Sequence, residues 1–286
     1  MISDITLGQF FPGYSPLHKL DPRTKIILAV LSIVAIFFAN NAVSFALLTL
    51  AAVVMIAISR ISFKVILRGI RPIIIILLFT AVLNILMTDG KGTPLVEFWI
   101  ISIYTEGIVR AVFMALRVVL LIVITSMLLT YTTSPISLTD GLESLLSPLK
   151  VIRVPVHTFA MMMSIALRFI PTLIEETEKI MNAQKSRGAD FSSGGLIKRA
   201  KALIPILIPL IVSSFKRAEE LATAMECRCY RGDKNRTKLV KLQFKGRDIV
   251  WFLAIAAITA GIILLSILPY KFVSPGIIYD IAFFKI

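Results

Sequence analysis

Five runs of this sequence are almost purely apolar and long enough, or nearly so, to cross a bilayer. The hydrocarbon core of a bilayer takes about 20 residues of helix, and inside it each backbone polar group must be hydrogen-bonded within the segment. None of the runs contains Asp or Glu, and the mean hydropathy of the chain is +0.87. The sequence therefore predicts an all-α integral membrane protein with about five spans. These are residues 24–38, 42–59, 72–87, 108–130 and 249–268.

The distribution of basic residues predicts how the spans are oriented. Residues 131–248 hold 19 of the 31 Lys and Arg residues, against 11 acidic ones. Basic segments resist translocation and stay in the cytoplasm. This rule also accounts for the net charge of +14, so nucleic-acid binding is not needed to explain it. We therefore expect a four-span membrane domain over residues 1–130, a cytoplasmic domain over 131–248, and a last span with an outer tail over 249–286. The N-terminus is then cytoplasmic and the C-terminus lies outside.

Residues 131–248 are predicted to form about three amphipathic helices inserted before the last span. The leucines of residues 138–149 follow helical spacing. The apolar runs 156–170 and 203–215 are shorter than a span requires, and each continues into an amphipathic segment. We expect these two runs to lie along or beneath the membrane face. The alternative, that one or both cross the bilayer, stays open.

Two stretches of this inserted segment are nearly the same sequence, and each reaches an arginine. Residues 178–188 contain Ala183 and Arg187, and residues 219–229 contain Ala224 and Arg228. In both, a glutamate lies nine residues before the arginine and the alanine lies four before it. A helix C-terminus stabilises a terminal arginine, whose guanidinium can fork onto carboxylates or carbonyls of a partner. Although many helices end in Lys or Arg, the matched pair predicts docking onto a two-fold cytoplasmic partner.

Motifs for catalysis, nucleotide binding and metal binding are missing from the sequence. It has no G-x-x-x-x-G-K-[ST] loop and no H-E-x-x-H, and its only cysteines, Cys227 and Cys229, lie far from either histidine. We therefore expect no metal, no cofactor and no catalytic residues. At membrane depth, Arg110 and Arg117 could bind an anion; we favour the alternative that Arg110 snorkels and Arg117 pairs with a neighbouring helix or with carbonyls. Energy and substrate binding are then expected from other subunits.

Two parts of the sequence resemble a known family. The opening GQFFPGYSPLHKLDPRTK, residues 8–25, resembles the N-terminus of the transmembrane T components of energy-coupling-factor (ECF) transporters, the EcfT/CbiQ-like branch of the ABC transporters. The stretches 186–188 (Ser-Arg-Gly) and 227–229 (Cys-Arg-Cys) resemble that family's two X-Arg-Gly motifs. The second copy has Cys229 where the family has glycine, and Arg231-Gly232 is the literal motif three residues on. The spacing of Glu219 and Ala224 favours Arg228.

The resemblance implies a non-enzymatic coupling subunit of an ATP-driven importer of vitamins or metal ions in a prokaryotic cell membrane. Its partners would be two ABC ATPase subunits, a small substrate-binding S component in the membrane, and the lipid bilayer. Nucleic acid is not an expected partner. The alternatives are a self-sufficient secondary transporter or channel, and a membrane-embedded enzyme. The expected ATPase-coupling residues are Ala183, Arg187, Gly188, Ala224 and Arg228. The apolar faces of 156–170 and 203–215 would form the S-component groove, with Met161, Met162, Ile165, Leu207, Ile208 and Ile211.

Overall fold

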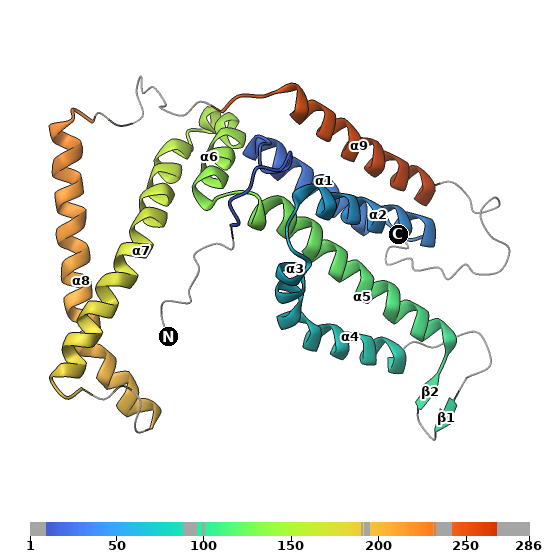
Figure 1. Ribbon diagram of the computed structural model, residues 1–286, viewed down its shortest axis with the longest axis horizontal. Helices are drawn as coiled ribbons and strands as arrows, with labels where there is room; N and C mark the ends of the chain where they lie inside the picture. Colours follow the sequence, from blue (N-terminus) through green and yellow to red (C-terminus); the bar gives the residue numbers. More distant parts are fainter. Residues whose placement is uncertain are drawn as a thin grey trace. The chain divides into compact units, whose positions relative to one another are not determined.

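The computed structural model describes residues 10–87, 96–98, 101–189, 195–230 and 242–267, together with residues 191 and 232 (Figure 1). Its described residues divide into two compact units. The first unit comprises residues up to 141 and those from 242 onward, and the second comprises the residues between them.

The first unit is a bundle of long apolar helices. Helix α1 packs against α9 and α5, and α2 packs against α5 (Figure 1). A π-helical segment, η2, continues α5 to the end of its run. The bounds are α1 Pro22–Phe38, α2 Ala42–Ser59, α5 Thr105–Thr125, η2 Ser126–Tyr131 and α9 Gly246–Ile267.

Between α2 and α5 the chain forms a short helix and then a long one. Helix α3 (Phe63–Ile70) is separated from α4 (Ile74–Met87) by the 3₁₀ turn η1 (Arg71–Ile73). Pro72 lies in this turn, where its missing N–H breaks the helical ladder. A two-stranded antiparallel hairpin of β1 (Val96–Phe98) and β2 (Ile101–Ile103) then leads to α5.

A buried polar cluster fixes the inner ends of three helices, by which we mean the ends near the start of α1. Asp21 caps α1 by accepting a hydrogen bond from the Arg23 amide at 2.9 Å. The Asp21 amide itself donates to the carboxylate of Asp248 in α9, at 2.8 Å. Lys25 is 1% exposed and donates to the carbonyl of Thr132, which follows η2, at 2.7 Å. The starts of α1 and α9 and the end of η2 therefore meet at one place.

The opposite end of the bundle is held by Arg117 of α5. Its guanidinium donates to the carbonyl of Ala39, just after α1, at 2.6 Å, and lies 5.5 Å from the centre of the Phe45 ring. Asn41 donates to the carbonyl of Leu265 in α9 at 3.0 Å. The structure thus confirms the expectation that Arg117 pairs with a neighbouring carbonyl. It also shows α1 and α9 running in the same direction and α5 running against them.

The second unit consists mainly of two very long helices. Helix α7 (Val156–Ser186) and helix α8 (Leu196–Cys227) cross each other (Figure 1). Helix α6 (Pro135–Leu145) runs across the division between the units, and the 3₁₀ segment η3 (Ser147–Ile152) connects it to α7. His157 at the start of α7 pairs with Glu143 at 2.9 Å.

The fold class predicted from the sequence, a helical membrane protein with about five spans, is confirmed, with two differences in detail. Helix α1 has 17 residues, slightly fewer than a spanning helix usually has. Helix α7 has 31 residues because it continues through Pro171 without interruption, so it is long and apolar enough to cross a membrane. The alternative that this segment spans therefore stays open. The helical runs that are long and apolar enough to cross a membrane are Ala42–Ser59, Phe63–Met87 (α3, η1 and α4 taken together), Gly107–Tyr131, Val156–Ser186 and Gly246–Ser266.

The Asp248 carboxylate should be a large contributor to the stability of the first unit. Its two oxygens accept from the amides of Asp21 and Lys245, each at 2.8 Å, and the residue is 2% exposed. We expect Asp248→Ala to destabilise the chain by about 3 kcal/mol, because it leaves the buried amide of Asp21 and the partly buried amide of Lys245 without acceptors. The measurement is the midpoint of unfolding of the purified full chain in detergent. Asp248→Asn should lose less, and the exposed Glu226→Ala should change nothing; equal midpoints for all three variants would contradict this role.

Candidate functional site

Helix α7 ends in a defined cap at the first predicted arginine. Arg187 is the C-cap residue, and Gly188 follows with φ +87°, in the left-handed region that glycine adopts readily. The Gly188 amide donates to the carbonyl of Lys185 at 2.9 Å, and the Ala189 amide donates to that of Gln184 at 3.0 Å. This pair of hydrogen bonds is the Schellman motif, which satisfies the last carbonyls of a helix.

Helix α8 ends in the same motif at the second arginine. Arg228 is the C-cap residue, and Cys229 takes φ +56° in the position of Gly188. The Cys229 amide donates to the carbonyl of Glu226 at 2.8 Å, and the Tyr230 amide donates to that of Met225 at 3.0 Å. A cysteine therefore supports the cap that the sequence pattern assigns to glycine. The alternative arginine, Arg231, lies outside the described residues.

The two capped helices cross at equivalent places. Arg217 of α8 donates to the carboxylate of Glu176 in α7 at 3.1 Å. Each of these residues lies eleven positions before the arginine that caps its own helix. At 1.5 Å per residue, each arginine is about 16 Å along its helix from this contact. The two C-terminal ends lie apart, on different sides of the crossing (Figure 1).

The side chains around both caps are available to a partner. Ala183, Arg187 and Gly188 are exposed on α7, and Ala224 and Arg228 are exposed on α8. We call these two surfaces the arginine tips. Neither tip is covered by another described part of the chain, so the guanidinium groups are free to meet an external surface.

The residues predicted for the S-component groove lie on the other halves of the same helices. Met162 of α7 is 48% exposed and Ile208 of α8 is 59% exposed, which is unusual for apolar side chains in water. Leu207 and Ile211 are also exposed, whereas Met161 and Ile165 are partly buried. Helix α8 bends along its length (Figure 1), and it contains Pro205 and Pro209, the usual cause of such a bend.

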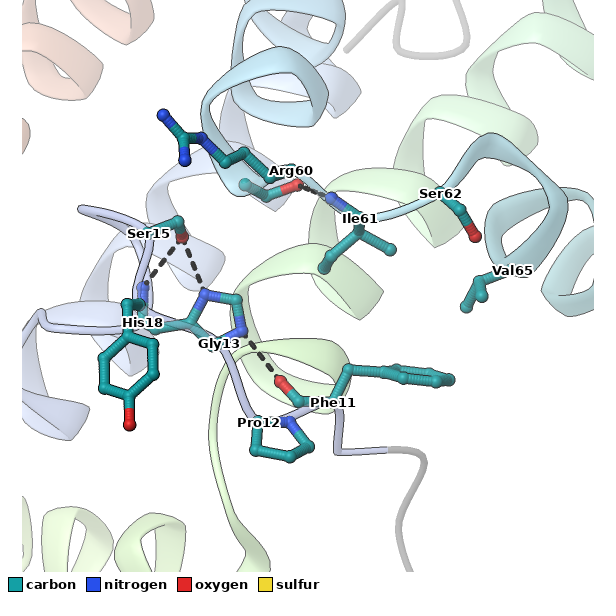
Figure 2. A pocket seen from close by; sticks show the side chains of 11 residues that line it. Phe11, Pro12, Gly13, Ser15, His18, Arg60, Ile61, Ser62 and Val65 are labelled. Carbon is teal, nitrogen blue, oxygen red and sulfur yellow. Dashed lines mark hydrogen bonds between the residues drawn. The ribbon is translucent and has the colours of Figure 1, made fainter.

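One cavity was not predicted from the sequence. It has a volume of about 370 Å³ and lies in the first unit, between the segment before α1 and the α2–α3 turn. Figure 2 shows the ring of His18 between the hydroxyl of Ser15, at 2.7 Å, and the carbonyl of Phe11, at 2.9 Å. Burial lowers the pKa of His18, so the ring favours its neutral form. Gly13 passes so close to this ring that a Cβ would clash with it. Part of the family-like opening sequence thus shapes one wall of the cavity.

Comparison with known proteins identifies relatives of this chain. A family model described as CbiQ, cobalt transport protein, matches residues 13–239. The energy-coupling factor transporter transmembrane protein EcfT of Clostridium kluyveri is 53% identical over 250 residues, covering 87% of this chain and 92% of that protein. The EcfT of Ruminiclostridium cellulolyticum is 55% identical over the same length and coverage. The EcfT of Bacillus subtilis is 49% identical over 261 residues, covering 90% of this chain and 98% of that protein.

A helical membrane protein with two arginine-capped helices in a separate unit is thus also a relative of transporter components. The chain belongs to the CbiQ family, so the family resemblance stated from the sequence is confirmed.

The equivalence of the two caps can be tested by exchanging their left-handed residues. Cys229→Gly should stabilise the end of α8 by about 1 kcal/mol, because a residue with a Cβ is strained at positive φ. Gly188→Ala should destabilise the end of α7 by a similar amount. Hydrogen exchange of the last turn of each helix measures both changes. Unchanged protection in both variants would show that the two caps do not depend on these residues.

Proposed function

We propose that this chain is the transmembrane coupling component of an ATP-driven importer of the energy-coupling-factor type. In this proposal the second unit is cytoplasmic, and each arginine tip seats on one of two ABC ATPase subunits. The movement of the ATPases passes through α7 and α8 to a small membrane S component that carries the substrate, a vitamin or a metal ion. The protein resides in the cell membrane with its N-terminus in the cytoplasm.

The observation that carries the proposal is the matched geometry of α7 and α8. Both helices end in the same cap, and the Glu176–Arg217 contact lies eleven residues before the arginine in each. A partner with two-fold symmetry presents two identical sites. Two similar arginine tips, one on either side of the point where α7 and α8 cross, match such a partner. Two ATPase subunits of one dimer are such a partner.

The chemistry of each tip suits a groove on a soluble protein. The C-terminal end of a helix carries partial negative charge, which holds an arginine near it. The exposed guanidinium retains its planar donors for carboxylates or carbonyls of the partner. The alanines four residues earlier, Ala183 and Ala224, are small and leave space for the partner's surface to approach each helix.

The exposed apolar side chains of α7 and α8 suit the membrane partner. Met162, Ile208 and their neighbours would be costly to leave in water, and methionine adapts to partners of different shape. We therefore assign this face to the S component, with Met161, Met162, Ile165, Leu207, Ile208 and Ile211 as the contact residues.

The structure gives the secondary-transporter alternative less support. That alternative needs a free ionisable group at membrane depth, and Arg117 was one of the two available. Its guanidinium instead donates to the carbonyl of Ala39 and stacks over Phe45. An arginine engaged in this way holds helices together and is poorly placed to bind a transported anion.

Removing both arginine tips should uncouple transport without unfolding the protein. Arg187→Ala or Arg228→Ala removes a charge-assisted contact worth about 1.5–3 kcal/mol, which weakens ATPase binding by about one to two orders of magnitude. The double variant should abolish substrate uptake in reconstituted vesicles. Lysine at either position should restore the function only partly, because it keeps the charge and loses the planar fork.

The matched control is Lys179→Ala/Lys216→Ala, which removes two exposed charges from the same two helices away from the caps. It should keep normal ATPase co-purification and uptake. The coupling role of the tips would be refuted by normal values for both measurements in the Arg187→Ala/Arg228→Ala variant. The same substitution at Arg231 separates the two registers of the second motif.

A charge on the apolar face should affect the S component and spare the ATPases. Met162→Glu or Ile208→Glu places a carboxylate where we expect an apolar contact, at a cost of several kcal/mol if it stays charged and buried. The S component should then be lost from the purified complex while both ATPase subunits are retained. Full occupancy of the S component in these variants would show that its binding surface lies elsewhere.

A further inference from the structure

Helix α3 has three distinct faces. Ile66 is buried on the first, where Gly69 lies directly under the hydroxyl of Tyr131. At 100° per residue, Phe63 and Leu67 form a second face, and both are exposed, at 64% and 50%. Lys64 and Arg68, with Arg71 in the next turn, form a third face beside the apolar one. The helix thus carries an apolar strip and a basic strip side by side, both facing away from the bundle.

The turns at both ends of α3 set it across the spans. Arg60 takes φ +57° at the end of α2, which lets the chain change direction before α3 begins. Pro72 lies in the 3₁₀ turn that ends α3. Figure 1 shows α3 running across the directions of α2 and α4. Because α2 is a candidate span and α4 is a largely apolar helix, a helix that crosses their direction at their ends lies along the membrane surface.

The charge of this region is not compensated in the sequence. No Asp or Glu occurs between Asp21 and Asp89. Arg60, Lys64, Arg68 and Arg71 are all exposed, and no ion pair of theirs occurs among the described residues. Four cations beside an exposed apolar strip favour a surface that is both anionic and apolar.

Helix α4, which follows α3 in the chain, also indicates that lipid covers the apolar strip. None of the residues of α4 is buried within the chain. An apolar helix of this kind in a membrane protein faces acyl chains, and the exposed strip of α3 leads directly into it through η1. The basic strip then lies at the level of the headgroups.

We propose that α3, with Arg60 and Arg71 at its ends, is an interfacial helix that binds the headgroup of an anionic phospholipid. Phe63 and Leu67 rest among the upper acyl carbons. Lys64, Arg68 and Arg71 bind the phosphate and its neighbours. The site anchors the inner end of the bundle to anionic lipid, and it does not depend on the identity of the transported substrate.

Native mass spectrometry of the full chain in detergent tests the proposal. Phosphatidylglycerol and phosphatidylcholine are added separately, and the Kd of the first bound lipid is measured. We expect phosphatidylglycerol to bind more tightly, and Lys64→Gln/Arg68→Gln/Arg71→Gln to remove that preference, since each cation near a headgroup contributes about fivefold in affinity. The triple control Lys179→Gln/Lys185→Gln/Lys216→Gln removes as many exposed charges from α7 and α8 and should keep the preference.

Two further measurements are needed. The first separates the contribution of the apolar strip from that of the charges, and the second distinguishes binding of lipid from binding of a free anion. Phe63→Ser/Leu67→Ser should weaken both lipids by similar factors. Millimolar inorganic phosphate should fail to displace phosphatidylglycerol from the wild-type chain. If the triple glutamine variant loses its thermal unfolding transition, Arg68→Gln alone replaces it, with an expected loss of about fivefold.

Three results would overturn the proposal. The first is an unchanged lipid preference in a folded variant of the basic strip. The second is an equal loss in the α7/α8 control, which would indicate an effect of net charge only. The third is displacement of the lipid by phosphate, which would assign the region to a soluble anion.

Discussion

The hydrogen bond from the Asp21 amide to the Asp248 carboxylate connects residues 227 positions apart and determines how the helices of the first unit are arranged. It brings the start of α9 to the start of α1, and Lys25 brings the end of η2 to the same place through Thr132. The segment between Thr132 and Asp248 therefore begins and ends at this one place in the first unit. This constraint allows a spanning bundle to carry a large separate unit without breaking the order of its helices.

The second unit is built mainly from two similar helices, α7 and α8. Equal caps at Arg187 and Arg228, and a contact eleven residues before each, mean that α7 and α8 present equivalent ends. Exposed apolar residues occupy their other halves. One pair of helices thus offers a polar surface at its ends and an apolar surface along its length. The proposed coupling of ATPase subunits to a membrane partner requires both kinds of surface on the same pair of helices.

Much of the fold could be predicted because apolar runs determine spans. Helix α2 occupies the predicted 42–59, and α1 and α9 begin two or three residues earlier than predicted. The matched arginine stretches were visible as a repeated spacing. Other features depend on tertiary contacts: η1 separates α3 from α4, α7 continues through Pro171, and Cys229 adopts a left-handed conformation that its residue type disfavours. The cavity beside His18 and the role of Asp248 require residues far apart in sequence, which periodicity does not reveal.

Photo-crosslinking from matched positions tests the central claim most directly. Lys185 and Glu226 are exposed and lie two residues before the two arginines. A photoreactive amino acid placed at each, one at a time, reports what each tip touches in the assembled complex in the membrane. The account predicts that both positions crosslink to nucleotide-hydrolysing subunits, and that a chain labelled at both captures two subunits at once. Crosslinks from only one position, or from both to the same subunit copy, would contradict it.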